Sequence, residues 1–255
     1  AVAYDGSSTL VAVGYSGTIL TSSDGTTWTS RTSGTSDNIT NVFYKTGGGF
    51  VATGGNGLLI ISADGTTWTS KTSGCGMTED MWSINLESST GVIIGDNGSI
   101  YTSTDRGDSC TKRTSGTTVE LNELLYGDST FVAAGDNGTV LTSSDGITWT
   151  SRSSSTTNDL YGGTYTDSDA DGAKKFVFVG ASGKLLSSNS TYTTWTPIEL
   201  SSISTGNLFG LARGGTTWVI VGTSGYISSI TDDESDVTTR TSGTTEYLRR
   251  VFYKP

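Results

Sequence analysis

The stretch GGNGLLIISADGTTW, residues 54–68, decides the fold of this chain, because variants of it occur six times along the sequence. Each copy starts with a Gly-x-x-Gly turn and continues into a short apolar strand, and the clearest copies then read Ser-x-Asp-Gly-x-Thr-Trp. The second glycines of the turns are 40, 41, 40, 45 and 42 residues apart, and they are Gly17, Gly57, Gly98, Gly138, Gly183 and Gly225. A repeat of this length with four short strands per unit is typical of a propeller, a solenoid or an array.

The second copy shows how each repeat divides into strands. Residues 39–44 predict an inner strand A, 50–53 a strand B, 58–62 a strand C and 67–71 an outer strand D. Apolar and polar residues alternate in these segments, and Gly and Asp-Gly turns bound them, which is the signature of antiparallel hairpins. The sequence therefore predicts an all-β fold, a six-bladed β-propeller with four antiparallel strands per blade, as a single domain over residues 1–255.

Both ends of the chain carry a copy of strand A. Residues 2–4 match the end of that strand and residues 248–251 are a further copy, so seven inner strands are available for six sets of strands B, C and D. An open sheet edge favours aggregation, and a closed ring removes that edge. We therefore expect the ring to be closed by pairing of the terminal strands, with either terminal copy in the inner position.

Composition and charge exclude several classes of function. The net charge is −10 and the chain has no histidine, whereas non-specific nucleic-acid binding needs a basic surface. The same charge argues against binding to an anionic membrane surface, and no apolar run approaches the roughly 18 residues that span a bilayer. Without histidine, imidazole zinc ligands and Ser-His or Cys-His nucleophiles are excluded. We expect no nucleic-acid partner and no membrane insertion.

The start of the chain and its composition favour secretion. The first residue is Ala1 and the chain is acidic, rich in Ser and Thr and poor in Lys, as in an extracellular protein whose signal peptide has been removed. An excised domain or a trimmed sequence would start in the same way. Four Asn-x-Ser/Thr sequons agree with secretion but also arise by chance in such a repeat, and they begin at Asn38, Asn97, Asn137 and Asn189.

The Ser-x-Asp-Gly-x-Thr-Trp hairpin resembles the Asp box of sialidase-like (BNR) propellers. It contains Asp24, Asp64 and Asp145 in three copies, and in a fourth Asp105 is followed by Cys110 in place of Trp. With the Gly-x-x-Gly segments, nearly the whole chain looks like the photosystem II assembly-factor propellers and their bacterial relatives. The resemblance implies a propeller with an assembly role, although those factors have seven blades and a basic patch. Since an Asp box is a structural hairpin in families of unrelated activity, we expect its Asp to accept turn amides and its Trp to pack between blades.

Three functions are open from the sequence. We expect first a secreted, non-catalytic recognition propeller that binds carbohydrate as a multivalent lectin, because near-identical repeats gain from avidity. The second is a protein-binding or assembly scaffold. The third is a sialidase-like glycoside hydrolase, which needs a pair of carboxyls about 5–9 Å apart, and only Glu123 is well placed for it. Repeated aromatic pockets would favour glycans, and one asymmetric patch around Trp82, Tyr161 and Arg249 would favour a scaffold.

The candidate binding residues lie where the copies differ. In an up-and-down blade the start of strand A and the Gly-x-x-Gly turn share one face, and the side chains that vary there suit recognition of sugar rings or peptide side chains. They are Trp82, Asn122, Glu123, Tyr161, Phe209, Arg249 and Arg250. The alternative is that the three aromatic residues only fill the central channel. No residue is predicted to be catalytic.

One motif lies outside the repeat. Asp167, Asp169 and Asp171 alternate and precede Gly172, like the first half of a calcium loop. The twelfth position is Phe178, so the bidentate Glu of such loops is missing. We expect no required cofactor and a weak Ca²⁺ site at these three carboxylates, with a solvated acidic hairpin as the alternative.

The two cysteines are predicted to remain unpaired with each other. Cys75 follows strand D of the second repeat, and Cys110 begins strand D of the third repeat. A strand of about five residues separates these levels by roughly 17 Å, which is beyond the reach of a disulfide. The exception would be a loop after Gly74 that folds down the side of the blade.

Overall fold

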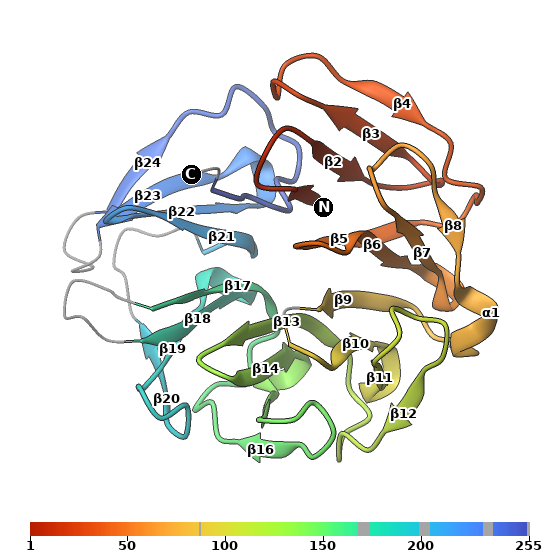
Figure 1. The fold of residues 1–255 in the computed structure, drawn as a ribbon. Helices are drawn as coiled ribbons and strands as arrows, with labels where there is room; N and C mark the ends of the chain where they lie inside the picture. The colour runs from red at the N-terminus through yellow and green to blue at the C-terminus, as the bar shows by residue number, and fades with distance from the viewer. Residues whose placement is uncertain (87, 168–173, 199–204, 232–236, 254–255) are drawn as a thin grey trace. The chain divides into compact units, whose positions relative to one another are not determined.

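The structure, a computed structural model, shows one antiparallel sheet for each repeat. In each of the six sheets the four strands follow one another in chain order (Figure 1). No helix in the described part of the chain is long and apolar enough to cross a membrane. The residues that the structure describes are 1–86, 88–167, 174–198, 205–231 and 237–253.

The chain divides into two compact units by its contacts, and the first unit contains residues 1–124 and 145–148. It holds the first three sheets. The strands of the first sheet are β1 (Val2–Tyr4), β2 (Leu10–Val13), β3 (Ile19–Ser22) and β4 (Thr29–Arg31). Those of the second are β5 (Ile39–Lys45), β6 (Gly49–Gly54), β7 (Leu59–Ser62) and β8 (Thr69–Ser70). Those of the third are β9 (Met81–Asn85), β10 (Gly91–Gly95), β11 (Ile100–Ser103) and β12 (Thr111–Arg113).

The second unit contains residues 125–144 and 149–255. It holds the fifth and sixth sheets and most of the fourth, whose first strand begins in the first unit. The fourth sheet consists of β13 (Leu121–Gly127), β14 (Thr130–Gly135), β15 (Val140–Ser143) and β16 (Thr150–Arg152). The fifth consists of β17 (Leu160–Thr166), β18 (Lys175–Gly180), β19 (Leu185–Ser188) and β20 (Trp195–Ile198). The sixth consists of β21 (Leu208–Gly214), β22 (Thr217–Gly222), β23 (Ile227–Thr231) and β24 (Val237–Arg240).

Five of the six Gly-x-x-Gly turns form short 3₁₀ turns between strands B and C, and the first repeat has the exception. In the third sheet, Asn97 has a φ of 55° and Gly98 a φ of 65°, a left-handed conformation that glycine adopts without strain. A Cβ on Gly98 would lie 2.2 Å from the carbonyl oxygen of Thr117. The second glycine is therefore needed because the start of the next repeat touches the turn. The equivalent turns elsewhere are η1 (Gly55–Gly57), η3 (Asp136–Gly138), η4 (Ala181–Gly183) and η5 (Thr223–Gly225).

The core of each unit lies between neighbouring sheets. In the first unit, Phe50 and Ile60 of the second sheet pack with Val11 and Ile19 of the first. In the second unit, Phe178 and Trp195 of the fifth sheet pack with apolar residues of the fourth. The alternation of apolar residues along the strands thus buries an apolar cluster between one sheet and the next.

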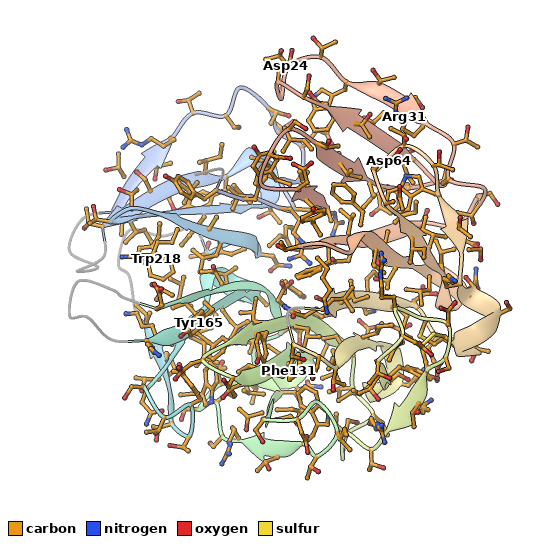
Figure 2. All side chains as sticks on the ribbon, viewed as in Figure 1. Asp24, Arg31, Asp64, Phe131, Tyr165 and Trp218 are labelled. Carbon is orange, nitrogen blue, oxygen red and sulfur yellow. A yellow bond between two sulfur atoms is a disulfide. The ribbon has the colours of Figure 1, made fainter. Side chains whose placement is uncertain are left out.

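The Asp-Gly hairpins have the structural role that the sequence predicts for their carboxylates. Asp24 Oδ1 accepts the amides of Thr26 and Thr27 at 2.8 and 2.7 Å, and Asp24 lies in the turn between β3 and β4 (Figure 2). The tryptophans of these hairpins, which were expected to pack between blades, differ in burial from one repeat to another. Trp195 is buried, whereas Trp28 is 37% exposed.

The predicted pairing of the terminal strands in one blade is wrong for the part of the chain that the structure describes. The first sheet takes its inner strand, β1, from the N-terminal copy. Ala1 and Val13 exchange two backbone hydrogen bonds of 3.0 and 2.9 Å, so the N-terminal copy occupies the pairing edge of β2. The C-terminal copy, residues 248–251, belongs to none of the six sheets.

The prediction that the cysteines are unpaired with each other is also wrong. Cys75 and Cys110 form a disulfide with their Cα atoms 4.5 Å apart. The reason is the short helix α1 (Thr72–Cys75), which carries Cys75 down to the hairpin between β11 and β12. Gly74 allows the approach, since a Cβ there would lie 2.3 Å from the carbonyl oxygen of Asp108.

Candidate functional site

The second unit brings four side chains together at the start of the sixth sheet. The ring centroids of Tyr161 on β17 and Phe209 on β21 are 5.4 Å apart, and those of Phe209 and Tyr247 are 5.9 Å apart. The guanidinium carbon of Arg249 lies 5.1 Å from the centroid of Phe209 and 5.9 Å from that of Tyr247. Tyr161, Phe209, Tyr247 and Arg249 are called the aromatic–arginine patch below.

The aromatic–arginine patch is open to solvent on one side. Tyr247 is 57% exposed and Arg249 is exposed, whereas Tyr161 and Phe209 are half-buried. Tyr161 is held further by its hydroxyl, which donates a hydrogen bond of 3.3 Å to Asp159 Oδ2. Half-buried rings below an exposed ring and a guanidinium form a supported platform for another apolar or planar group.

The C-terminal segment, residues 246–253, brings Tyr247 and Arg249 to the patch by docking on the sixth repeat. The amide of Gly225 in η5 donates to the carbonyl of Glu246 at 2.8 Å. The amide of Leu248 donates to the carbonyl of Gly222 at 3.0 Å. These two bonds fix the segment at the end of the sixth sheet where the B-to-C turn lies.

The same pair of hydrogen bonds holds a true inner strand in the first unit. There the amide of Gly17 donates to the carbonyl of Asp37 at 2.8 Å, and the amide of Ile39 donates to the carbonyl of Gly14 at 3.0 Å. Ile39 is the first residue of β5. The C-terminal segment therefore docks as the inner strand of a following repeat would dock, although it pairs with no strand B among the described residues.

A ring-on-glycine contact completes this docking. The ring of Tyr253 covers Gly214 at the end of β21 so closely that a Cβ there would lie 2.5 Å from a ring carbon. Tyr165 (Figure 2) makes the equivalent contact with Gly127 of β13, where a Cβ would lie 2.3 Å from the ring. The two tyrosines occupy the same repeat position. The contact therefore holds β17 against the fourth sheet and the C-terminal segment against the sixth sheet in an equivalent way.

Tyr247 replaces a residue that has a structural role in other copies. At this position a side-chain oxygen accepts the amide of the preceding Gly-x-x-Gly turn at 2.8–3.3 Å, and the acceptors are Asn38, Asp80, Asp159 and Asn207. A tyrosine hydroxyl lies too far from its own backbone to copy this short cap, and the ring of Tyr247 packs on Phe209 instead. Tyr247 was not among the residues predicted from the sequence. The signal that could have identified it is an aromatic residue at a repeat position that otherwise holds Asn, Asp or Glu.

Among the predicted candidates, Phe209 thus contacts both Tyr161 and Arg249 within the second unit. Arg250 follows in the same segment, and a Cβ on Gly210 would lie 3.1 Å from its Cα, so its backbone lies close against β21. A side chain at position 210 would therefore fit only if the C-terminal segment moved slightly.

The remaining candidates, Trp82, Asn122 and Glu123, lie in the first unit. The indole nitrogen of Trp82 donates a hydrogen bond to Asp96 of the neighbouring turn. Asn122 is half-buried on β13, and Glu123 is only 6% exposed. The hydrogen bond to Asp96 gives Trp82 a structural role within the third repeat that the sequence did not predict.

A second polar cluster in the first unit was also missed. Glu79 accepts hydrogen bonds from Ser99, Tyr101 and Lys112. Burial by itself raises the pKa of Glu79, but the bonds from Lys112, from the amide of Thr78 and from Tyr101 outweigh this effect and lower the pKa to about 2. Burial, and then the bond to Glu79, raise the pKa of Tyr101. Because these groups satisfy one another, the cluster stabilises the linker before β9 and offers no vacant polar group.

Two grooves recur at equivalent repeat positions in the second unit. One measures about 820 Å³ and is lined by the turn of the sixth repeat and the loop after β24. The other measures about 730 Å³ and is lined by the turn of the fourth repeat and the loop after β16. Both walls are mainly Ser, Thr and Gly with one arginine each, and of the two only the first includes an aromatic residue, Tyr226. The repeated aromatic pocket expected for a multivalent lectin is absent from these two grooves.

The predicted calcium residues fall largely outside the described part of the chain. Asp167 is described and exposed, whereas Asp169 and Asp171 lie outside the described residues. Among the described residues, no group of three or more His, Cys, Asp or Glu side chains could hold a metal ion. Calcium binding therefore stays a prediction.

Solved structures with the same fold include two of YCF48. The structure of YCF48 bound to D1 peptide has a TM-score of 0.73 at 16% identity, over 94% of this chain and 79% of that chain. YCF48 from Cyanidioschyzon merolae has a TM-score of 0.70 at 15% identity, over 94% and 84%. The WD40 propeller domain of Doa1 has a TM-score of 0.73 at 10% identity, over 98% and 83%. At these identities the likeness concerns the fold.

The chain is a six-bladed β-propeller. Its four antiparallel strands per blade confirm the fold class predicted from the repeat. No family model matches the sequence, and no curated protein matches it. The Asp-box resemblance therefore rests on the repeat itself.

Proposed function

We propose that this propeller is a non-catalytic scaffold that binds a segment of a partner protein on the aromatic–arginine patch. The observation that carries the proposal is the exposed Tyr247 and Arg249, both packed on the ring of Phe209. Aromatic and arginine side chains on a supported platform are typical of the residues that dominate protein interfaces. Among the described residues of the second unit, the patch occurs once. Of the three residues around which a scaffold was expected to show one asymmetric patch, it contains Tyr161 and Arg249, whereas Trp82 lies in the first unit.

Two further observations support a protein ligand over a glycan. The two equivalent grooves do not share an aromatic wall, so repetition alone does not produce sugar-binding sites. One propeller with this fold, YCF48, has been solved bound to a peptide. A protein ligand is therefore the better-supported form of the recognition function.

We also propose that the protein works in an oxidising compartment, as the secretion hypothesis requires. The support is the Cys75–Cys110 disulfide, because disulfides persist mainly in secreted and other oxidising environments. Mass spectrometry of the protein from its native source, with rapid thiol blocking, would test this. A thiol-modified Cys75 in most molecules would contradict it.

The binding proposal is tested with a displayed library of random 12-residue peptides selected on the folded protein. Peptides that are enriched should lose about 2 kcal/mol of binding free energy with Phe209→Ala or Tyr247→Ala, the size of an interface hot spot. Tyr15→Ala is the matched control, since Tyr15 is 66% exposed and lies in the first unit. Thermal melts of all variants separate lost binding from lost folding.

Two results would contradict the proposal. One is the absence of any enriched peptide. The other is full affinity of both patch variants together with early melting, which would mean that the rings only fill the propeller channel.

A further inference from the structure

The guanidinium of Arg249 differs from the other arginines of the repeat. Four arginines at the ends of outer strands each donate from Nε to a hydroxyl on strand C of the same sheet, and they are Arg31, Arg113, Arg152 and Arg240. The guanidinium carbon of Arg249 instead lies over the rings of Phe209 and Tyr247, 5.1 and 5.9 Å from their centroids. No hydrogen bond or ion pair joins it to any described residue.

Contact with two rings holds the guanidinium of Arg249 in place without using its N–H donors. A guanidinium that lies against rings presents its N–H donors sideways, in the fork geometry that matches a carboxylate. An exposed ion pair alone contributes little, because water screens it. The rings beside the guanidinium make such an ion pair stronger. A ligand that covers the rings also removes water from the ion pair, and two charges attract each other more strongly where water is excluded.

The charge of the whole chain makes an unpaired arginine at this place notable. The chain has 25 acidic and 15 basic residues, so an arginine has many carboxylates with which it could pair. The C-terminal segment nevertheless holds Arg249 by its backbone docking and by the Tyr253–Gly214 contact. The fold thus keeps the guanidinium on the aromatic rings and apart from every carboxylate that the structure describes.

We propose that the patch binds an acidic side chain of an extended peptide segment, with Arg249 as the carboxylate receptor and Tyr247 and Phe209 as the contact for an adjacent apolar or aromatic side chain. This inference rests on the proposed peptide-binding function and names the chemistry of its ligand. Tyr247 and Arg249 both contact the ring of Phe209, and residues two positions apart on an extended peptide are separated by about 7 Å. The acidic and apolar residues of the ligand should therefore be within about two positions of each other.

The test compares two displayed libraries of 12-residue peptides. The acidic library encodes Asp and Glu, and the neutral library encodes Asn and Gln at the same positions. Wild-type protein should enrich peptides from the acidic library, with Asp or Glu within two positions of an aromatic or aliphatic residue. Remaking one enriched peptide with Glu→Gln should weaken binding at least about tenfold at low salt, as for a charge-assisted hydrogen bond, and less at high salt.

Arginine variants show which residue causes the preference for the acidic peptide. Arg249→Gln should bind the acidic peptide and its Gln version equally, and Arg249→Lys should recover only part of the difference, because lysine lacks the planar fork. Arg240→Gln is the matched control, since it removes the same charge from an exposed arginine in the same unit. It should leave the preference for the acidic peptide unchanged.

The outcomes separate the two proposals. Enrichment from both libraries, with loss of binding in Phe209→Ala but no effect of Arg249→Gln, keeps the binding function and overturns the acidic ligand. An equal loss of preference in Arg240→Gln also overturns it, because the effect would then be long-range charge. Enrichment from neither library overturns both.

Discussion

Cys110 is bonded to Cys75 and stands at the repeat position where four other copies have tryptophan. In two of those copies the indole N–H bonds back to the hairpin, since Trp28 donates to the carbonyl of Gly25 at 3.2 Å and Trp68 to that of Gly65 at 3.0 Å. In the third sheet a covalent link to helix α1 takes the place of the indole. The disulfide therefore substitutes for an apolar contact and ties the linker before β9 to the hairpin.

Replacing both cysteines by serine should lower the free energy of unfolding by about 3–4 kcal/mol, the loop-closure value for the 35-residue separation of the bridge. Urea unfolding of Cys75→Ser/Cys110→Ser measures it. Wild-type protein in a reducing agent is the control and should show a similar loss. A loss below about 1 kcal/mol would mean that α1 holds the linker without the bridge.

Replacing the tryptophan of the hairpin by alanine should lower the free energy of unfolding by different amounts in different repeats. Trp195 is 2% exposed and packs on Phe178, whereas Trp28 is 37% exposed. Trp195→Ala should cost about 3–5 kcal/mol, as for a buried aromatic side chain, and Trp28→Ala should cost about 1 kcal/mol. Urea unfolding compares the two variants. Equal losses would contradict the assignment of Trp195 to the core and Trp28 to the surface.

Stability should fall in acid partly because of Glu79. Its pKa is lowered from 4.5 to about 2 in the folded protein, so its charge stabilises the fold above pH 4.5 and this contribution is lost as the pH falls toward 2. Glu79→Gln should be less stable than wild type at pH 7 and should show a shallower decline between pH 4.5 and 2. Unfolding free energies at several pH values measure both slopes, and parallel slopes would refute the assignment.

Gly214→Ala should release the C-terminal segment without unfolding the sheets. The added Cβ would lie 2.5 Å from the ring of Tyr253, so the ring must move away. Hydrogen exchange of residues 246–253 should rise, and peptide affinity should fall because Tyr247 and Arg249 are no longer held on Phe209. The double variant Gly214→Ala/Tyr253→Ala removes the clash and shows whether the ring itself is needed. Unchanged exchange in the single variant would mean that the two backbone bonds hold the segment alone.

The sequence by itself determined the six repeats, the four strands of each blade and the carboxylate caps of the hairpins. These features come from short-range rules: the alternation of side chains across a strand recurs in every copy, and the turn preferences of Gly and Asp recur in most of them. The same repetition also identified three of the four patch residues, Tyr161, Phe209 and Arg249, as positions that depart from the pattern.

Only the tertiary structure decided which terminal copy enters a sheet, that the cysteines meet, and that Tyr247 joins the patch. Both terminal copies have the same strand pattern, so backbone pairing of Ala1 with Val13 distinguishes them. The disulfide depends on one helical turn, residues 72–75, which the strand pattern does not encode. Tyr247 reaches Phe209 because the C-terminal segment docks on the sixth repeat. Each of these is a contact between segments distant along the chain, and local preferences do not select among such contacts.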